Sequence, residues 1–163
     1  MSSYTTIFYH IVFSTERRKR VLGKTRRDDL YRFIWGVLQK RRCKLFRIGG
    51  VEDHIHILTS LHPAIALSDL VHELKDSSAA WIKGGRVFPD FSQWQAGCAV
   101  FTHSLYDKER LIEYIRTQEQ RHKQISFREE YEMLLTEAGL TIHEHDEEWF
   151  DDDEGAGDPP EEE

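Results

Sequence analysis

Two histidines separated by one residue could bind a divalent cation. His54 and His56 flank Ile55 in an apolar run, and residues two apart on a β-strand point to the same face of the sheet. Two imidazole nitrogens would then lie side by side, while Ile55 would face a helix layer on the other side. The motif is also common by chance, because nine histidines in 163 residues give about half an H-x-H per chain. Taken alone, it leaves a metal site and a structural pair equally open.

The other histidines form weaker patterns. His143 and His145 make a second H-x-H, but a charged residue separates them and acidic residues follow, so a solvated segment is the simpler interpretation. His10 lies in an apolar run and is expected to be a structural histidine beside the site. The remaining histidines show no paired spacing, and no ligand role is expected for His62, His72, His103 or His122.

A tyrosine and a glutamine four residues apart could complete such a site. Tyr114 and Gln118 would project from one side of a helix, near its apolar stripe. One interpretation is a partly buried tyrosine with a polar neighbour. The other places this helix across the sheet, so that the Gln118 carbonyl adds an oxygen ligand to two imidazoles and leaves coordination positions open for a phosphate. Tyr114, one turn away, would then be an in-line nucleophile.

Apolar periodicity predicts the elements that would position these residues. We expect strands over residues 4–14, 44–48, 55–61 and 98–102, and helices over 28–40, 68–83, 107–122 and 126–139. The expected N-cap residues are Asp28 or Asp29, Ser68 and Ser126, the last in a capping box with Glu129. Gly139 can end the last helix, and two glycines connect the second and third strands. The order β-α-β-β-α-β is typical of an α+β, ferredoxin-like or RRM-like antiparallel sheet with helices on one face, here with additional C-terminal helices.

The charge of the chain is divided between its ends. The formal net charge of −7 argues at first against a nucleic-acid partner. Residues 1–47, however, carry a net charge of +10, whereas residues 144–163 carry −12. We expect a folded domain over residues 1–142 and an acidic, disordered tail over 143–163. The run 16–20 is too charged to be buried. Basic residues that could contact DNA phosphates, or form a solvated charged face, are Arg17, Arg18, Lys19, Arg20, Arg41, Arg42, Lys44 and Arg47.

Composition sets further limits. Hydrophobic residues make up 39% of the chain, which is enough to build a core at this length. Cys43 and Cys98 show no CxxC spacing, and no charged-then-apolar leader precedes them, so we expect a reduced, intracellular protein. No apolar run approaches the roughly 20 residues that cross a bilayer. We therefore expect no membrane partner.

The combined motifs resemble a known family. The segments that carry the resemblance are 9–14 in the first strand, 49–58 at the histidine pair and 114–119 in the late helix; 68–75, Trp81 and 91–97 are also similar. Together they resemble the single-tyrosine HUH transposases of small insertion sequences that transpose as single-stranded DNA, and their relatives associated with repetitive extragenic palindromes. The resemblance covers about residues 4–140.

The resemblance implies a site and a reaction. His54 and His56 match the metal-binding pair, and Gln118 matches the polar residue that completes the site. Tyr114 matches the nucleophile, which would cleave and rejoin DNA at element ends through a 5′-phosphotyrosine. The cofactor would be Mg²⁺ or Mn²⁺, and the enzyme would be a metal-dependent DNA strand transferase acting in DNA transposition and recombination.

The resemblance also implies partners and a location. Members of the family work as homodimers, and an active site can combine the histidine pair of one subunit with the tyrosine helix of the other. The expected substrate is single-stranded DNA with hairpin ends, and no small-molecule substrate is expected. The protein would act in the cytoplasm of a bacterial or archaeal cell.

Two alternatives stay open at this point. A noncatalytic RRM-like module for single-stranded RNA or DNA would normally carry aromatic residues on its outer sheet face and would need no metal. A HUH nickase that initiates replication would share the tyrosine chemistry, but the matches over 9–14 and 113–119 favour the transposase. Metal-dependent cleavage distinguishes the enzyme from the binding module.

Overall fold

The computed structural model describes residues 2–142. The strands are β1 (Phe8–Ser14), β2 (Leu45–Gly50), β3 (His54–Ser60) and β4 (Ala99–Thr102). The helices are α1 (Lys24–Lys40), α2 (Leu67–Gly85), α3 (Lys108–Arg116), α4 (Gln118–Arg121) and α5 (Phe127–Glu137), with the short 3-10 turns η1 (Glu16–Arg18) and η2 (Leu105–Asp107). The predicted acidic tail, residues 143–163, lies outside the described residues, and so does the second H-x-H pair, His143 and His145.

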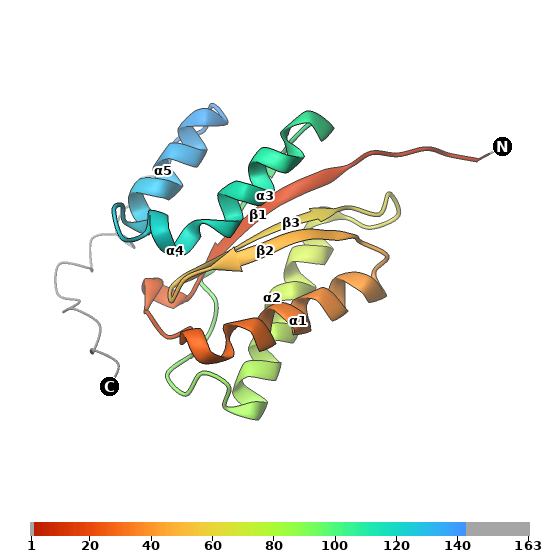
Figure 1. Cartoon of the computed structure of the whole chain (residues 1–163). Coiled ribbons are helices and arrows are strands. Elements are labelled where there is room, and N and C mark those ends of the chain that lie inside the picture. The colour runs from red at the N-terminus through yellow and green to blue at the C-terminus, as the bar shows by residue number, and fades with distance from the viewer. Residues whose placement is uncertain (1, 143–163) are drawn as a thin grey trace.

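A four-stranded antiparallel sheet in the order β2-β3-β1-β4 organises the domain. β1 pairs with both β3 and β4 and is therefore a central strand. α1 and α2 cover one face, whereas α3, α4 and α5 lie along the other (Figure 1). The predicted α+β, ferredoxin-like sheet with additional C-terminal helices is therefore confirmed.

Alternating side chains on β1 and β3 divide the interior into two layers. Ile11, Phe13 and Ile55 pack against α1 and α2 in the main core. Val12 points to the opposite face, where it packs with apolar residues of β4 and α5. Because side chains alternate along a strand, His54 must share the face of Val12 and not that of Ile55. The histidine pair thus faces the C-terminal helices.

Helix α1 begins one turn earlier than predicted. It starts at Lys24, so the expectation that Asp28 or Asp29 caps it is wrong. The reason is tertiary: Arg27 in the first turn is buried and donates a hydrogen bond to the Gly50 carbonyl at 3.2 Å. This contact holds the first turn of α1 against the β2–β3 hairpin, an effect that capping preferences cannot reveal.

The other helix ends agree better with their local signals. α2 begins at Leu67, so Ser68 lies inside its first turn instead of capping it; Leu67 is partly buried against the main core, which favours its inclusion. Ser126 caps α5 by accepting a hydrogen bond from the Glu129 N–H, as predicted. Gly139 has φ +75° and ends α5 in the left-handed conformation that glycine tolerates. Within residues 2–142, no helix has both the length and the apolar character to cross a membrane.

The predicted helix over 107–122 is divided in two. α3 and α4 meet at Thr117, whose φ of −97° and ψ of 19° leave the helical region. Its Oγ1 donates to the carbonyls of Glu113 at 3.1 Å and Tyr114 at 3.3 Å, a side-chain bond that often bends helices. The bend changes the direction of the chain just before Gln118.

Candidate active site

The predicted histidine pair lies at the beginning of β3, on the face toward the C-terminal helices. His54 and His56 are fully buried, and their ring centroids are 5.1 Å apart. Across the ladder, His54 is opposite Ser14 and His56 is opposite Val12 of β1. The two rings therefore lie side by side, as the strand period predicted.

A glycine allows the tyrosine helix to approach the sheet closely. Gly49 pairs with His56 in the β2–β3 ladder. A Cβ atom at this position would lie 2.8 Å from the carbonyl oxygen of Ile115, which is too close for van der Waals contact. Ile115 is buried with Leu58 of β3. α3 consequently rests on β2 and β3 beside the histidines.

Both predicted residues of the late helix reach the histidine pair within one chain. Gln118 is buried, and its Oε1 lies 3.2 Å from His54 Nε2. The Tyr114 ring lies edge-on to His56 with a centroid separation of 5.9 Å. The guanidinium of Arg121 lies 3.8 Å from the Tyr114 ring centroid. The structure thus brings together all four residues that the sequence analysis singled out.

A carboxylate that the sequence analysis did not single out lies at the centre of this cluster. Glu130 of α5 is only 1% exposed. Its Oε1 lies 3.1 Å from His54 Nε2 and 3.0 Å from His56 Nε2. Its Oε2 accepts hydrogen bonds from the Tyr114 hydroxyl and, at 2.8 Å, from Gln118 Nε2. One carboxylate therefore joins the imidazoles to the phenol.

His122 also belongs to the cluster, although no ligand role was expected for it. Its Nε2 lies 2.9 Å from Gln118 Oε1 and 3.1 Å from Glu130 Oε1. His54, His122 and Glu130 each offer a ligand atom, all within 4.8 Å of one another. Two signals were present in the sequence: His122 follows Gln118 by one helical turn, and Glu130 lies on the apolar side of its helix with Phe127.

The hydrogen bonds of the rings determine what the centre of the cluster can hold. His54 Nδ1 donates to Asp53 Oδ1 at 2.6 Å, and His122 Nδ1 donates to the Ile125 carbonyl at 3.0 Å. In the neutral rings, an unprotonated Nε2 would therefore face Glu130 Oε1, which is also an acceptor. Either additional protons or a cation must lie between these atoms. Imidazole nitrogens with amide and carboxylate oxygens form a donor set that fits a divalent cation.

His10 of β1 lies beside the site, as predicted. Its Nε2 is 2.8 Å from His56 Nδ1, and the two rings are stacked with centroids 5.0 Å apart. Burial lowers the pKa of His10 well below its usual range and also lowers the pKa of His56. A neutral His10 can therefore fix the His56 ring with Nε2 toward Glu130.

In the absence of a cation, the charges around the cluster keep one proton on His54 and one on Tyr114. Burial lowers the pKa of His54, but Asp53 and Glu130 outweigh it and raise that pKa to about 9. Burial and the Glu130 carboxylate both raise the pKa of Tyr114. Burial alone would raise the pKa of Glu130, but hydrogen bonds to its imidazole partners outweigh it and lower the pKa. Glu130 is therefore ionised, whereas His54 and Tyr114 keep their protons near neutral pH.

The predicted DNA-binding residues fall into two groups near opposite ends of the sheet. The first follows β1 at the end where Ser14 pairs with His54; it comprises Arg17, Arg18, Lys19 and Arg20. The second lies around the start of β2, near the pairing of Leu45 with Thr59; it comprises Arg41, Arg42 and Lys44, with Arg47 farther along the strand. Seven of the eight are exposed, but Arg18 is only 7% exposed. The expectation that the whole run 16–20 is unburied is therefore wrong, because the stem of a long basic side chain can be covered.

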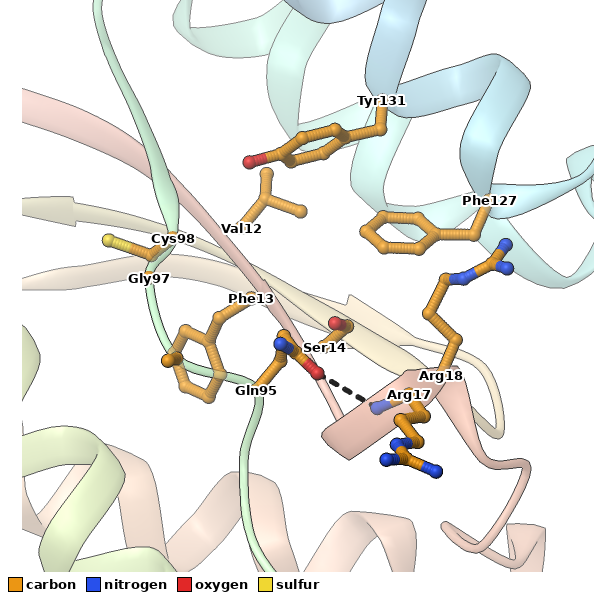
Figure 2. Close-up of a pocket in the computed structure, with 11 residues that line it drawn as sticks. Val12, Phe13, Ser14, Arg17, Arg18, Gln95, Gly97, Cys98, Phe127 and Tyr131 are labelled. Atoms are coloured by element: carbon orange, nitrogen blue, oxygen red, sulfur yellow. Dashed lines mark hydrogen bonds between the residues drawn. The ribbon is translucent and has the colours of Figure 1, made fainter. Parts of the chain in front are cut away.

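A pocket of about 140 Å³ opens between the end of β1, residues 95–98 and α5 (Figure 2). The backbone N–H of Arg17 donates to Gln95 Oε1 at 2.8 Å across its edge. Phe127 forms the wall shared with the cluster, since its ring stacks on His54 at a centroid distance of 4.0 Å. Aromatic and guanidinium groups at one opening suit a strand of nucleic acid.

Comparison with known proteins gives consistent matches. A family model described as "Transposase IS200 like" matches residues 3–118. The ISDra2 transposase TnpA of Deinococcus radiodurans is 24% identical over 120 residues, which are 68% of this chain and 82% of that protein. A candidate transposase of known structure from Deinococcus radiodurans shows 22% identity and a TM-score of 0.58, over 72% of this chain and 95% of that one. A REP-associated tyrosine transposase bound to a REP hairpin shows 18% identity and a TM-score of 0.54, over 77% and 76% of the two chains. These two structures share the fold described above.

Proposed function

This chain belongs to the IS200-like transposase family, and on that premise we propose that it cleaves and rejoins single-stranded DNA at the ends of a mobile element. The observation that carries the proposal is the convergence of the half-buried Tyr114 with the buried His54, His56 and Gln118 in one cluster. The proposed activity is that of a metal-dependent DNA strand transferase. The match to a transposase family favours this function over a replication nickase or a noncatalytic RRM-like module.

Tyr114 is the proposed nucleophile. Its hydroxyl oxygen attacks the phosphorus of the scissile phosphodiester, and the bond to the 3′ oxygen breaks. The products are a 5′-phosphotyrosine on the protein and a free 3′-hydroxyl on the other DNA fragment. Because one phosphodiester replaces another, the step is nearly neutral in free energy and reversible. A new 3′-hydroxyl can therefore attack the intermediate and rejoin the strand without ATP.

His54, His56 and Gln118 are the proposed ligands of Mg²⁺ or Mn²⁺. When bound, such a cation polarises a non-bridging phosphate oxygen and offsets the charge that develops in the transition state. The chain contributes the orientation of the ligands, because Asp53 holds the His54 ring and His10 holds the His56 ring. A ligand histidine is commonly fixed through its second nitrogen in this way.

The proton of the nucleophile has a defined partner. The Tyr114 hydroxyl donates to Glu130 Oε2, so the proton leaves along a hydrogen bond that already exists. In the cation-free cluster it stays on Tyr114, since the pKa of the phenol is raised. Positive charge brought beside the phenol would lower this pKa and favour release of the proton.

The DNA is proposed to enter at the end of β1. Arg17, Lys19 and Arg20 are exposed there and can contact phosphates without reading the sequence.

Hairpin ends are the proposed substrate, in accord with the REP hairpin bound to the structural neighbour. We propose a homodimer in the cytoplasm of a bacterial or archaeal cell, in which one chain can supply both the histidine pair and Tyr114.

The first prediction concerns covalent chemistry. We expect the protein, incubated with Mn²⁺ and a labelled single-stranded oligonucleotide that carries an element end, to form a covalent band on a denaturing gel. Tyr114→Phe should abolish the band, because the phenyl ring occupies the same space as the tyrosine ring but carries no hydroxyl to act as the nucleophile. Tyr106→Phe is the matched control, since Tyr106 is 96% exposed and should not affect the yield. Adduct formation by Tyr114→Phe at the wild-type yield would contradict the proposal.

A further inference from the structure

Glu130 occupies an unusual position for a carboxylate. It is 1% exposed, and burying a charge is costly unless it is paired or binds a metal. The partners of Oε1 are the Nε2 atoms of His54, His56 and His122, at 3.1, 3.0 and 3.1 Å. Each of these rings can carry its proton on Nδ1, so three nitrogen lone pairs and one oxygen converge. This arrangement is explained best by positive charge at the point where they meet.

The distances between the donor atoms correspond to one coordination sphere. Cis ligands at about 2.1 Å from a six-coordinate ion are separated by about 3.0 Å, whereas tetrahedral ligands would be separated by about 3.4 Å. The three contacts of Glu130 Oε1 are 3.0 to 3.1 Å. Gln118 Oε1 lies 3.2 Å from His54 Nε2 and 2.9 Å from His122 Nε2. Each of these five separations matches the edge of an octahedron. The ligand atoms of His54, His122 and Glu130 all lie within 4.8 Å of one another, and His56 joins this group through Glu130 Oε1.

The second nitrogen of each ring is also held as in metal sites. Asp53 fixes His54, the Ile125 carbonyl fixes His122, and His10 fixes His56. Ligand histidines typically bond through their other nitrogen to a carboxylate, a carbonyl or a similar group, which sets the tautomer and the ring orientation. His122 meets this criterion as fully as the two histidines of β3.

We infer that Glu130 and His122 are ligands of the same divalent cation as His54, His56 and Gln118, and that Glu130 Oε2 positions the Tyr114 hydroxyl beside it. The inference rests on the proposed function and extends it to the segment after residue 118, where the family match ends. Five ligands leave one position of a six-coordinate ion for a phosphate oxygen. Three imidazoles with two oxygens favour Mn²⁺ over Mg²⁺, because Mg²⁺ prefers oxygen ligands and retains its water.

The decisive experiment measures metal binding without DNA. Mn²⁺ is titrated into the full-length protein and free Mn²⁺ is followed by electron paramagnetic resonance. We expect Glu130→Gln to weaken binding at least about 10-fold, the minimum effect of disturbing a ligand's support, and His122→Asn to do the same. Glu132→Gln is the matched control, because it makes the same charge change on the exposed side of α5 and should leave the affinity unchanged.

The outcomes separate this inference from the proposed function. The inference would be overturned if the Glu130→Gln variant bound Mn²⁺ as tightly as the wild type. Tighter binding would also overturn it, because it would show that Glu130 competes with the cation. If Glu130→Gln fails to fold by circular dichroism, His122→Asn decides by the same criterion. Wild-type adduct formation together with unchanged Mn²⁺ affinity of both variants would reject the five-ligand site while leaving Tyr114 as the nucleophile. If both variants lose Mn²⁺ affinity but the wild type forms no adduct, the five-ligand site is supported and Tyr114 is rejected as the nucleophile.

Discussion

At the residue scale, the proposed metal site would set a proton and a cation in competition for the same nitrogen of His54. Asp53 and Glu130 raise the pKa of His54 to about 9 against the effect of burial, so Nε2 carries a proton near neutral pH in the cation-free protein. A cation needs that nitrogen unprotonated. The two forms of the site should therefore respond to pH in opposite ways.

The resulting prediction concerns stability as a function of pH. His54 has a usual pKa of 6.5 and a folded-state pKa of about 9, so its protonation stabilises the fold fully below 6.5 and the effect is lost as the pH rises through about 9. With a chelator present, we expect the free energy of unfolding to fall over this interval, by at most about 3 kcal/mol. Below pH 6.5 it should fall again, since the pKa values of His10 and His56 are lowered.

Saturating Mg²⁺ should remove the alkaline decrease, because the cation replaces the departing proton. Urea unfolding at several pH values, with chelator and with Mg²⁺, measures both curves. Parallel curves between pH 6.5 and 9 would show that His54 does not exchange a proton for the cation.

The residues of the site differ in how far they could be predicted. His54 and His56 are close in sequence, and Tyr114 and Gln118 are one helical turn apart, so local spacing indicates each pair. Glu130 contacts His54 across 76 positions of sequence, and no local pattern fixes such a contact. Only its place on the apolar side of a helix could have marked it, since buried carboxylates are rare unless they are paired.

At the scale of elements, one close contact and one bend place the tyrosine helix. Gly49 permits α3 to rest on β2, and Thr117 bends the chain so that α4 presents Gln118. The strands follow from apolar alternation and were predicted within a few residues. The bend and the early start of α1 were not predicted, because both depend on particular hydrogen bonds and not on periodicity.

A single methyl group tests the close contact. We expect Gly49→Ala to destabilise the protein by roughly 1–3 kcal/mol, since its Cβ would meet the Ile115 carbonyl at 2.8 Å and force α3 away from the sheet. The yield of the covalent adduct should fall with it, because Tyr114 moves with α3. Gly36→Ala is the matched control: nothing lies within 4 Å of a Cβ there, and alanine in helix α1 should stabilise by up to about 1 kcal/mol. Equal stabilities and equal adduct yields for the two variants would show that Gly49 does not position α3.

At the scale of the whole molecule, the sheet separates two basic surfaces. The group at the end of β1 lies near the end of the sheet that carries His54, whereas the group at the start of β2 lies near the other end. The order of elements and the ferredoxin-like sheet followed from the sequence. The separation of the two groups was not predicted, although it follows from that order: β1 and β2 both run antiparallel to β3, so the end of β1 and the start of β2 lie at opposite ends of the sheet.

Two variants of equal charge change test which surface guides the DNA. In a Tyr114→Phe background, which prevents cleavage, we expect Arg17→Ala/Lys19→Ala/Arg20→Ala to weaken binding of single-stranded DNA strongly. It should reduce the slope of log K against log salt by about 2, since each lost phosphate contact contributes about 0.7. Arg41→Ala/Arg42→Ala/Lys44→Ala should change the slope by less than half as much. Equal losses in fluorescence anisotropy titrations would mean that both ends of the sheet bind the strand.

The most direct test of the central claim is to locate the covalent bond. The adduct formed with Mn²⁺ and single-stranded DNA is digested with protease and nuclease, and the modified peptide is sequenced by mass spectrometry. The predicted result is a nucleotide joined to the Tyr114 oxygen through its 5′ phosphate. A nucleotide joined to any other residue would contradict the account. So would the absence of an adduct from folded protein that binds both Mn²⁺ and DNA.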